Sequence, residues 1–473
     1  MINVESRLRA EHLIADIEGQ YQSVTEVNRD LNRLLVSFQA NKKKPIYRWF
    51  KYKEGFSKPF LDYVFEHSNI KTGGVVLDPF AGSGSTCFAA NERGLYSIGV
   101  ELLPVGCHFI RVRELLHRVG MNTVQEWLHD IYDKKPWQIP TEINKTFSHL
   151  NITRGAFPLN SEKELMNYLF WSDSLPHDMR VFCKFVAFGI LEDISYTRKD
   201  GQFLRWDYRA QKGSRKSSFS KGNIPTFSDA LLDKCRIIES DLSSLAHDQI
   251  LTSIDSRHNK IKSPLTLYEG SNFFHLNNIR KRSIDLVVTS PPYCNRYDYT
   301  RTYALELAYL NLTDMQIKEM RQSLLSCTVE NRPKDFQNII DPMSLEKIRK
   351  LVSESKALTA ILNFLRAEKE EHRLNNNAVI GMIECYFFEM AVHIYQLALV
   401  MKRHGKVYMV NDNVRYNGIT IPVDCILSSM AEKLGFKCLK IWVLPVGKGN
   451  SSQQMKAHGR SETRKCVYLW ERQ

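Results

Sequence analysis

Hydrophobic and polar positions alternate along residues 46–118 in a way that predicts strands and helices in turn. Short apolar runs at Val75–Leu77 and Tyr96–Val100 are typical of buried strands. The segment Ser85–Arg93 between them has the spacing of a helix. A strand, a helix and a second strand in this order predict two parallel neighbours joined by a right-handed crossover, and therefore an α/β sheet.

The same pattern returns in residues 263–473, after a long interruption. A helix near Glu384–Arg403 is expected to lead into one of the strands, and a charged helical insertion fills residues 303–373. The chain therefore carries two separated halves of an α/β domain. The strands predicted in the second half are Leu265–Tyr268, Ile284–Thr289, Lys406–Val410, Lys437–Leu444 and Cys466–Trp470.

Two segments fall outside this alternation. Residues 119–262 hold scattered helical segments and form an inserted region. Residues 1–45 begin with a helix that is expected to reach residue 41, with a seam of positions at steps of four and three residues. That spacing fits either a helix lying on the main domain or a short coil that joins two copies of the chain. The seam consists of Ile17, Tyr21, Val24, Asn28, Leu31 and Leu35.

Composition narrows the classes of protein that the chain can represent. Lys and Arg number 65 against 52 Asp and Glu, a net charge of +13 that suits a polyanionic partner. The ten cysteines form no Cys-x-x-Cys pair, so neither a zinc site nor a disulfide framework is expected, and a reducing cytoplasm fits best. We find no apolar run in the sequence long enough to span a bilayer, and the N-terminus is polar, so we expect neither a membrane partner nor a secretory signal.

The end of the first predicted strand has the chemistry of a cofactor site. A glycine turn follows it, and glycine lacks the Cβ that would block a ligand at the N-terminus of the next helix. Asp78 before the turn would repel a pyrophosphate, whereas Glu101 at the end of the next strand can accept both hydroxyls of a ribose. Ribose recognition without pyrophosphate recognition indicates S-adenosylmethionine. The residues expected to hold it are Asp78, Pro79, Phe80, Gly82, Gly84, Ser85 and Glu101.

A second group of reactive positions follows the strand predicted at Ile284–Thr289. Ser290, Pro291, Pro292 and Tyr293 lie at its carboxyl end, where open α/β sheets bind their ligands. The proline carbonyls and the Ser290 hydroxyl can accept hydrogen bonds from the exocyclic amine of a nucleic-acid base, and the Tyr293 ring can stack on it. Acceptors on both amine hydrogens favour a pyramidal nitrogen whose lone pair points at a methyl donor. These four residues are therefore the predicted catalytic set.

The run Asp78–Gly84 resembles the cofactor motif of amino-group DNA methyltransferases, many of which carry a near-identical Asp-Pro-Phe-x-Gly-Ser-Gly. The resemblance implies a Rossmann-like S-adenosylmethionine-dependent methyltransferase sheet with helices on both faces. It also implies that Phe56 and Ser57 close over the methionine part of the cofactor. By the same resemblance, Ser271 and Asn272 lie near the adenine.

The residue in the first catalytic position bears on which base is methylated. In the family that the chain resembles, cytosine-N4 enzymes favour Ser there, whereas adenine-N6 enzymes favour Asp or Asn. Ser290 thus implies N4 of cytosine, with N6 of adenine as the alternative. Cys294 suggests thiolate attack on a ring carbon, but such enzymes carry the thiol in a Pro-Cys pair, whereas Cys294 follows Tyr293.

A basic, aromatic stretch in the inserted region is the predicted DNA-binding element. A base inside a duplex must be flipped out before it can react, so the protein has to hold phosphates and read neighbouring bases. Residues 195–222 carry eight Lys or Arg against two Asp, and Arg and Gln can read base edges while Lys contacts phosphates. We assign target recognition to residues 119–262, with 303–373 able to share it. The predicted contacts are Arg198, Lys199, Gln202, Arg205, Arg209, Lys212, Arg215, Lys216 and Lys221.

The sequence as a whole predicts a site-specific DNA methyltransferase that acts on double-stranded DNA in the cytoplasm of a prokaryote. A role in restriction–modification or phage defence would add a cognate restriction endonuclease as a partner. Two other classes stay open at this point. One is an RNA base methyltransferase, because the same acceptors would serve any exposed amine. The other is a basic nucleic-acid-binding module without catalysis, against which the set Asp78, Glu101 and Ser290–Tyr293 argues.

Overall fold

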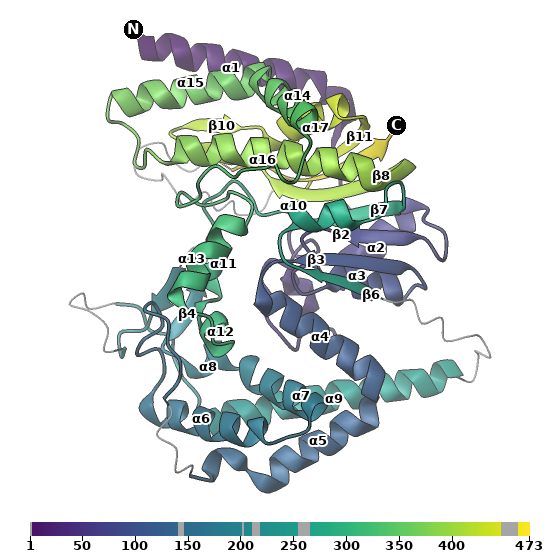
Figure 1. The fold of residues 1–473 in the computed structure, drawn as a ribbon, viewed down its shortest axis with the longest axis vertical. Coiled ribbons are helices and arrows are strands. Elements are labelled where there is room, and N and C mark those ends of the chain that lie inside the picture. Colours follow the sequence, from purple (N-terminus) through teal and green to yellow (C-terminus); the bar gives the residue numbers. More distant parts are fainter. Residues whose placement is uncertain (1, 141–145, 201–202, 211–217, 254–264, 446–461) are drawn as a thin grey trace.

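The computed structural model describes residues 2–140, 146–200, 203–210, 218–253, 265–445 and 462–473. One sheet of eight strands crosses its upper part, in the order β1-β11-β12-β8-β7-β2-β3-β6 (Figure 1). In that order the strands are Thr25–Val27, Phe436–Val443, Lys465–Arg472, Met401–Asp412, Ile284–Thr289, Val75–Asp78, Tyr96–Glu101 and Leu265–Glu269. The α/β class predicted from the sequence is therefore confirmed.

The centre of the sheet brings the two halves of the chain together. Strand β2 is parallel to β3 on one side and to β7 on the other, and α3 (Ser85–Asn91) connects β2 to β3 as predicted. The register pairs Val76 with Leu286 and Leu77 with Val287. Because these strands run in the same direction, the residues that follow β2 and β7 leave the sheet at the same edge.

Helices cover both faces of the sheet, since successive strand residues point to opposite sides. Val76 of β2 packs with Phe60 of α2 (Lys58–Ser68) on one face. Leu77 packs with α16 (Val379–Val400) and α17 (Val423–Lys433) on the other. Of the described helices, α16 alone is long and apolar enough to cross a membrane by length and composition, but 72% of that window is buried inside the protein. It is the central core helix of this face.

The N-terminal helix differs from the prediction. Helix α1 (Ile2–Gln20) ends well before residue 41, and the chain continues through a 3₁₀ turn (Gln22–Val24) into β1, which extends the edge of the sheet next to β11. Ile14 and Ile17 of α1 are buried in the same core as α15 (Lys356–Glu370) and α17. The helix thus lies on the main domain, which is one of the two alternatives that its spacing allowed, and it ends before most of the predicted seam.

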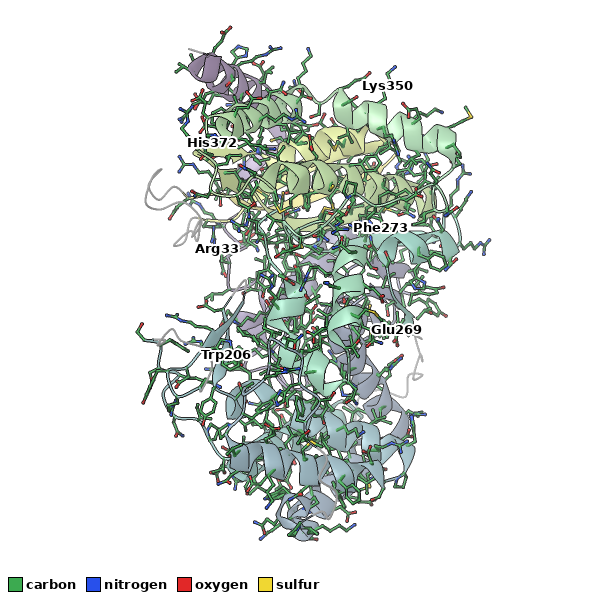
Figure 2. The ribbon with its side chains drawn as sticks, turned by 60° about the vertical axis from the view of Figure 1, so that its left-hand side comes forward. Arg33, Trp206, Glu269, Phe273, Lys350 and His372 are labelled. Atoms are coloured by element: carbon green, nitrogen blue, oxygen red, sulfur yellow. The ribbon has the colours of Figure 1, made fainter. Side chains whose placement is uncertain are left out.

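The inserted region forms a second lobe with its own core, below the sheet in Figure 1. Helix α12 (Ala304–Tyr309), from the predicted insertion 303–373, packs into that core, whereas α14 (Pro342–Ser353) and α15 lie on the sheet domain. Figure 2 shows Trp206 of β5 on the lower lobe and Lys350 of α14 at the opposite end of the molecule. The other elements of the lobe are α4 (Pro104–Val119), α5 (Met121–Lys134), α6 (Leu159–Asp173), α7 (His177–Phe188), α8 (Leu191–Ile194), β4 (Thr197–Asp200), β5 (Phe203–Trp206) and α9 (Phe227–Ser253).

Candidate active site

The ends of β2 and β7 meet directly. Thr289, the last residue of β7, donates its hydroxyl to Asp78 Oδ1 at 2.9 Å, and both side chains are buried. The backbone N–H of Phe80 donates to the same carboxylate oxygen at 3.1 Å. One carboxylate therefore joins the predicted cofactor turn to the residue immediately before Ser290, although the two lie more than two hundred positions apart in the chain.

Burial sets the protonation of Asp78. It raises the pKa of this carboxyl to about 6, although the nearby Thr86 hydroxyl and hydrogen bonds from Phe80 and Thr289 lower it. The carboxylate is thus ionised at neutral pH and held in place by two donors. A fixed negative charge at this point opposes phosphate groups and favours a cationic ligand.

The turn after β2 has the conformation that its glycines predict. Gly82 and Gly84 have φ of +55° and +73°, a region that side chains other than glycine rarely adopt. A Cβ on Gly84 would lie 2.7 Å from Ile110 Cγ1, and one on Gly82 would lie 2.8 Å from Tyr52 Cε1. On α4, a Cβ on Gly106 would lie 2.2 Å from the carbonyl oxygen of Gly82. The backbone of the turn is therefore packed too closely for any of the three to carry a side chain.

Glu101, at the end of β3, closes the turn from the other side. Its Oε2 accepts from the N–H of Gly82 at 2.5 Å and its Oε1 from the N–H of Leu103 at 2.7 Å. Burial raises the pKa of this carboxyl to about 8, and those two backbone donors lower it. Each oxygen keeps a second lone pair, so the carboxylate can still accept the two hydroxyls of a ribose.

A cavity opens at this edge of the sheet, with a volume of about 680 Å³ including its mouth. It is lined by residues from both halves of the chain, as the sequence predicts for a shared site. The predicted residues that line it are Phe56, Asp78, Pro79, Phe80, Gly82, Ser85, Glu101, Asn272, Ser290 and Pro292. Ser57, Gly84, Ser271, Pro291 and Tyr293 were also predicted, and they lie next to it rather than in its lining.

Two of these five have a visible structural task. Ser57 is buried and caps α2, because its Oγ accepts from the N–H of Phe60 at 3.2 Å and donates to the carbonyl of Leu35. Gly84 is the N-cap of α3. The family resemblance placed Ser57 at the methionine end of a cofactor, whereas here its hydroxyl is already engaged in holding the helix that follows.

Asn272 enters the cavity with support that the sequence did not reveal. Its Nδ2 lies 3.0 Å from Nδ1 of His393, a fully buried residue of α16 whose ring centroid is 5.0 Å from that of Phe80. Burial lowers the pKa of His393 to about 3, so the imidazole is neutral and Nδ1 accepts from the amide. His393 falls within a run of apolar helix positions, which is why periodicity reads it only as a core residue.

The catalytic loop is tied down by two residues from later strands. Ser290 Oγ lies 3.0 Å from Tyr293 Oη, and Nζ of Lys465 on β12 donates to the same Oη at 3.0 Å. Asp412, at the end of β8, forms an ion pair with Lys465 at 3.4 Å. Neither Asp412 nor Lys465 was assigned a role from the sequence.

An aromatic wall also borders the cavity, and its members Tyr52, Glu54 and Tyr303 were missed. Tyr52, Glu54 and Tyr299 line it, and Glu54 accepts hydrogen bonds from the hydroxyls of Tyr297 and Tyr303. The rings of Tyr52 and Tyr303 stack at 5.1 Å with an interplanar angle of 11°. These residues come from the segments just before Phe56 and just after Tyr293, so their closeness in sequence to both motifs was the available signal.

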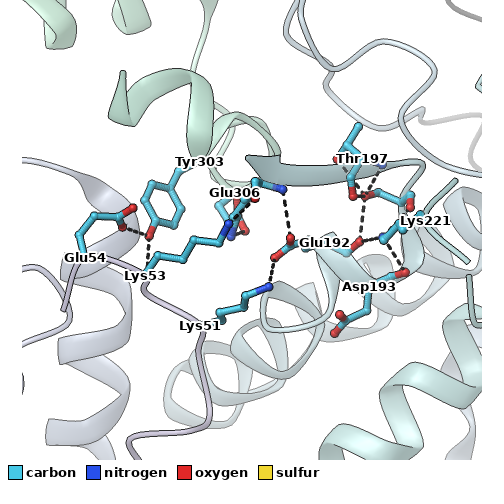
Figure 3. Close-up of polar contacts among 11 residues, drawn as sticks. Lys51, Lys53, Glu54, Glu192, Asp193, Thr197, Lys221, Tyr303 and Glu306 are labelled. Atoms are coloured by element: carbon cyan, nitrogen blue, oxygen red, sulfur yellow. Dashed lines mark hydrogen bonds and ion pairs between the residues drawn. The ribbon is translucent and has the colours of Figure 1, made fainter. Parts of the chain in front are cut away.

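Two of the predicted DNA contacts are wrong, because their side chains point inward, as Figure 3 shows for Lys221. The side chain of Lys199 is 2% exposed and pairs with Glu306 of α12, which is 1% exposed. Lys221 donates to the backbone carbonyls of Glu192, Asp193 and Ser195. Both lysines therefore hold the lobe together rather than face a polyanion.

The arginines of the hairpin remain available to a ligand to different degrees. Arg198 on β4 is exposed. Arg205 on β5 is 48% exposed and pairs with Asp200 at 3.3 Å across the hairpin, while Arg209 is 34% exposed and grips Asp207 through two nitrogens. Gln202, Lys212, Arg215 and Lys216 lie outside the described residues.

Comparison with known proteins identifies the class of this fold. A family described as DNA methylase matches residues 26–110. The Type II methyltransferase M.AvaI of Nostoc sp. is 41% identical over 454 residues, which cover 96% of this chain and 92% of that protein. The Type II methyltransferase M.BsoBI of Geobacillus stearothermophilus is 39% identical over 477 residues, covering 96% and 91%. Similarity to the putative methylase YubD of Escherichia coli is local, 48% over 56 residues and 12% of this chain.

Proposed function

Starting from the fact that the chain belongs to the family of Type II DNA methyltransferases that modify base amino groups, we propose that it methylates N4 of cytosine. The observation that carries amino-group methyl transfer in this proposal is the hydrogen bond from Thr289 to Asp78. It joins the glycine turn to the catalytic loop, of which Ser290 and Pro292 line the same cavity as the turn.

The cavity fits S-adenosylmethionine as the methyl donor, which supplies an electrophilic sulfonium carbon when bound. Gly82 and Gly84 give the turn the left-handed backbone that brings it to the cavity, and Asp78 presents a negative charge toward a cationic ligand. Glu101 would accept the ribose hydroxyls, and Asn272 would contact the adenine with its amide oriented by His393. Phe56 and Phe80 supply apolar walls.

The catalytic loop would act by positioning rather than by acid–base catalysis. Ser290 Oγ and a proline carbonyl would accept the two hydrogens of the exocyclic amine, so that its lone pair points at the methyl carbon. The ring of Tyr293 would stack on the flipped base. Aligned reactants need no strong base, because the proton can leave the methylated nitrogen for solvent afterwards.

Ser290 supports cytosine over adenine, since cytosine-N4 members of the family favour Ser in this position. The cavity floor itself would accept either exocyclic amine, so the identity of the base rests on this residue. The proposed substrate is a cytosine flipped out of duplex DNA, in a prokaryotic cytoplasm and in the company of a restriction endonuclease that reads the same site.

Exposed basic residues of the lower lobe would hold the DNA. Arg198 and Arg205 lie on the β4–β5 hairpin, which is joined to the cavity wall through buried residues of the lobe. In Figure 3 the strand that carries Thr197 lies above Glu192, with Tyr303 and Glu54 to its left. Glu54 lines the cavity, so a duplex bound along the hairpin would lie near the site.

Mass analysis of nucleosides from cells that express the protein tests the proposal, together with methylation-sensitive sequencing of the same DNA. We expect N4-methylcytosine at one short sequence. N6-methyladenine would transfer the proposal to the adenine alternative, methylated nucleosides only in RNA would replace DNA with RNA, and no new methylated base would contradict methylation altogether. In cells that express Tyr293→Ala the modified base should disappear, while duplex binding by the purified variant should persist.

A further inference from the structure

Lys465 lies next to the catalytic loop, and the proposed mechanism assigns it no role. Its side chain is 15% exposed, and its Nζ lies 3.0 Å from Tyr293 Oη and 4.8 Å from the centroid of that ring. Burial lowers the pKa of Lys465, but the carboxylate of Asp412 and the oxygen of Tyr293 outweigh it, so the side chain stays an ammonium. An ammonium has three donors and no acceptor, which fixes the direction of its hydrogen bond to Tyr293.

The sheet itself sets this position. In the antiparallel pairing of β12 with β8, Lys465 stands directly opposite Asp412. Strand β8 is in turn parallel to β7, where Thr289 pairs with Met409. The ammonium is therefore delivered to the tip of Tyr293 from a rigid strand two positions away in the sheet, and its place does not depend on the catalytic loop.

A contribution to folding stability does not by itself explain why a charged lysine lies next to Tyr293. Replacing a buried ion pair with apolar residues of similar volume often costs a protein nothing. The Asp412 side chain is 32% exposed, although its Oδ1, which faces the lysine, is buried. What the lysine adds is a charged donor at a hydroxyl that is itself 3.0 Å from Ser290 Oγ.

We propose that Lys465 is a positioning residue for the methyl-transfer reaction, one that holds the Tyr293 ring and the Tyr293–Ser290 hydroxyl pair in the geometry that receives the base. This inference rests on the proposed function. With one lone pair of Oη taken by the ammonium, the phenol can neither turn away from Ser290 nor swing its ring out of the stack. Loss of the ammonium frees both motions, so the base binds but is aligned less often.

The test is a double-mutant cycle between Lys465 and Tyr293 in the full-length enzyme. Lys465→Met removes the donor with little change in volume, and Tyr293→Phe removes its acceptor while keeping the ring. The rate of a single turnover is measured with tritiated S-adenosylmethionine and a DNA that the wild type methylates, both saturating. The affinities for S-adenosylmethionine and for DNA are measured separately by calorimetry and filter binding.

We expect Lys465→Met to lower the single-turnover rate by about tenfold to a hundredfold, the range for loss of a hydrogen bond to a charged group. Both affinities should change by less than about threefold, since the residue contacts neither ligand. Lys465→Arg should recover at least part of the rate, because a guanidinium keeps the charge and the donors. In the Tyr293→Phe background Lys465→Met should have no further effect, because the two changes remove one interaction.

Two controls keep the test sharp. Lys465→Met combined with Asp412→Asn removes the unpaired carboxylate, so a rate loss that persists in a variant melting like the wild type cannot be a folding defect. Lys440→Met on β11 deletes an ion pair with Glu26 whose lysine is 40% exposed, away from the cavity, and should leave the rate unchanged.

The inference is overturned if Lys465→Met turns over like the wild type, or if its effect adds fully to that of Tyr293→Phe. It is also overturned if the loss appears only as weaker DNA binding. Failure of the proposed function is distinguishable from these results, because the wild-type enzyme itself would then transfer no methyl group to DNA.

Discussion

The glycine turn after β2 and the β4–β5 hairpin were both predicted to meet a ligand, and they differ in how far residue type determined the outcome. In the turn, Gly82 and Gly84 have left-handed backbones, and Asp78 and Glu101 sit at the strand ends where the sheet delivers them. In the hairpin, the predicted contact Lys199 is buried. A turn that only glycine can form leaves one conformation, whereas a lysine can be satisfied by solvent, phosphate or a buried carboxylate.

Alternation along the strand could have separated the hairpin residues. Successive side chains of a strand point to opposite faces, so Arg198 and Lys199 cannot both face outward. Thr197 and Lys199 are buried while Arg198 and Asp200 are exposed. Counting basic residues therefore overestimated the DNA-binding surface. The alternation of side chains along Thr197–Asp200 would have shown that Lys199 points inward when Arg198 points outward.

The largest effect should come from the turn. Gly84→Val places a branched side chain at φ +73° and its Cβ 2.7 Å from Ile110, so strain and overpacking act together. We expect S-adenosylmethionine affinity in calorimetry to fall by at least about a hundredfold, since each of these effects costs roughly 1–3 kcal/mol. Gly381→Val, on an exposed stretch of α16 with nothing within 4 Å, is the control and should bind normally. Normal binding by a folded Gly84→Val protein would contradict the claim that the turn requires glycine at this position.

The next effect concerns Lys199 as a structural residue. Lys199→Met leaves Glu306 buried without its partner, which should lower the free energy of unfolding by about 3–5 kcal/mol in chemical denaturation. Arg205→Met breaks the exposed pair with Asp200 on the same hairpin and should cost at most about 1 kcal/mol. If Lys199→Met instead weakened DNA binding and left stability unchanged, Lys199 would be a DNA ligand after all.

The sequence could supply the sheet and the turn because both depend on backbone periodicity. The strands predicted at 75–77, 96–100, 265–268 and 284–289 all lie within strands of the structure. The sequence could not reveal side-chain contacts between residues that lie far apart in the chain. Lys465 reaches Tyr293 only through the register of β12 with β8, and His393 reaches Asn272 only through the packing of α16. Neither pairing leaves a local trace.

The N-terminal helix failed for a related reason. Its positions from Tyr21 to Leu35 keep a helical spacing, but residues 25–27 gain strand pairing by joining the edge of the sheet beside β11. Tertiary pairing of this kind overrides local spacing. The helix prediction was therefore wrong from the point where the chain pairs with the edge of the sheet.

A smaller effect is expected for Arg198, which faces outward on the hairpin, than for Lys199, its inward-facing neighbour. Arg198→Ala should leave stability unchanged and lower the dependence of log Kd on log salt concentration by about one unit, as expected for one lost phosphate contact. Lys350→Ala removes an exposed lysine from α14, at the other end of the molecule, and should leave that slope unchanged (Figure 2). Equal slopes for wild type and Arg198→Ala would take β4 out of the DNA interface.

The smallest effect should be the release of a proton from Glu101 when the cofactor binds. With a pKa of about 8 in the free protein, the Glu101 carboxyl is mostly protonated at pH 7, and a carboxylate is needed to accept two ribose hydroxyls. Binding should therefore release up to about 0.9 proton at pH 7, falling toward zero by about pH 9.5. The number is read from calorimetric enthalpies in buffers of different ionisation enthalpy.

Glu101→Gln isolates this proton, because the amino group of S-adenosylmethionine titrates in the same range and contributes equally to both proteins. The sign also fixes the effect on folding. A carboxyl whose pKa is raised in the folded state contributes stability that is present at low pH and lost as pH rises through about 8. The free wild-type protein should therefore lose stability relative to Glu101→Gln as pH rises from about 4.5 to about 8, and bound cofactor should offset that loss. Identical proton release by the two proteins would mean that Glu101 is ionised before the cofactor arrives, and that the two backbone donors already outweigh its burial.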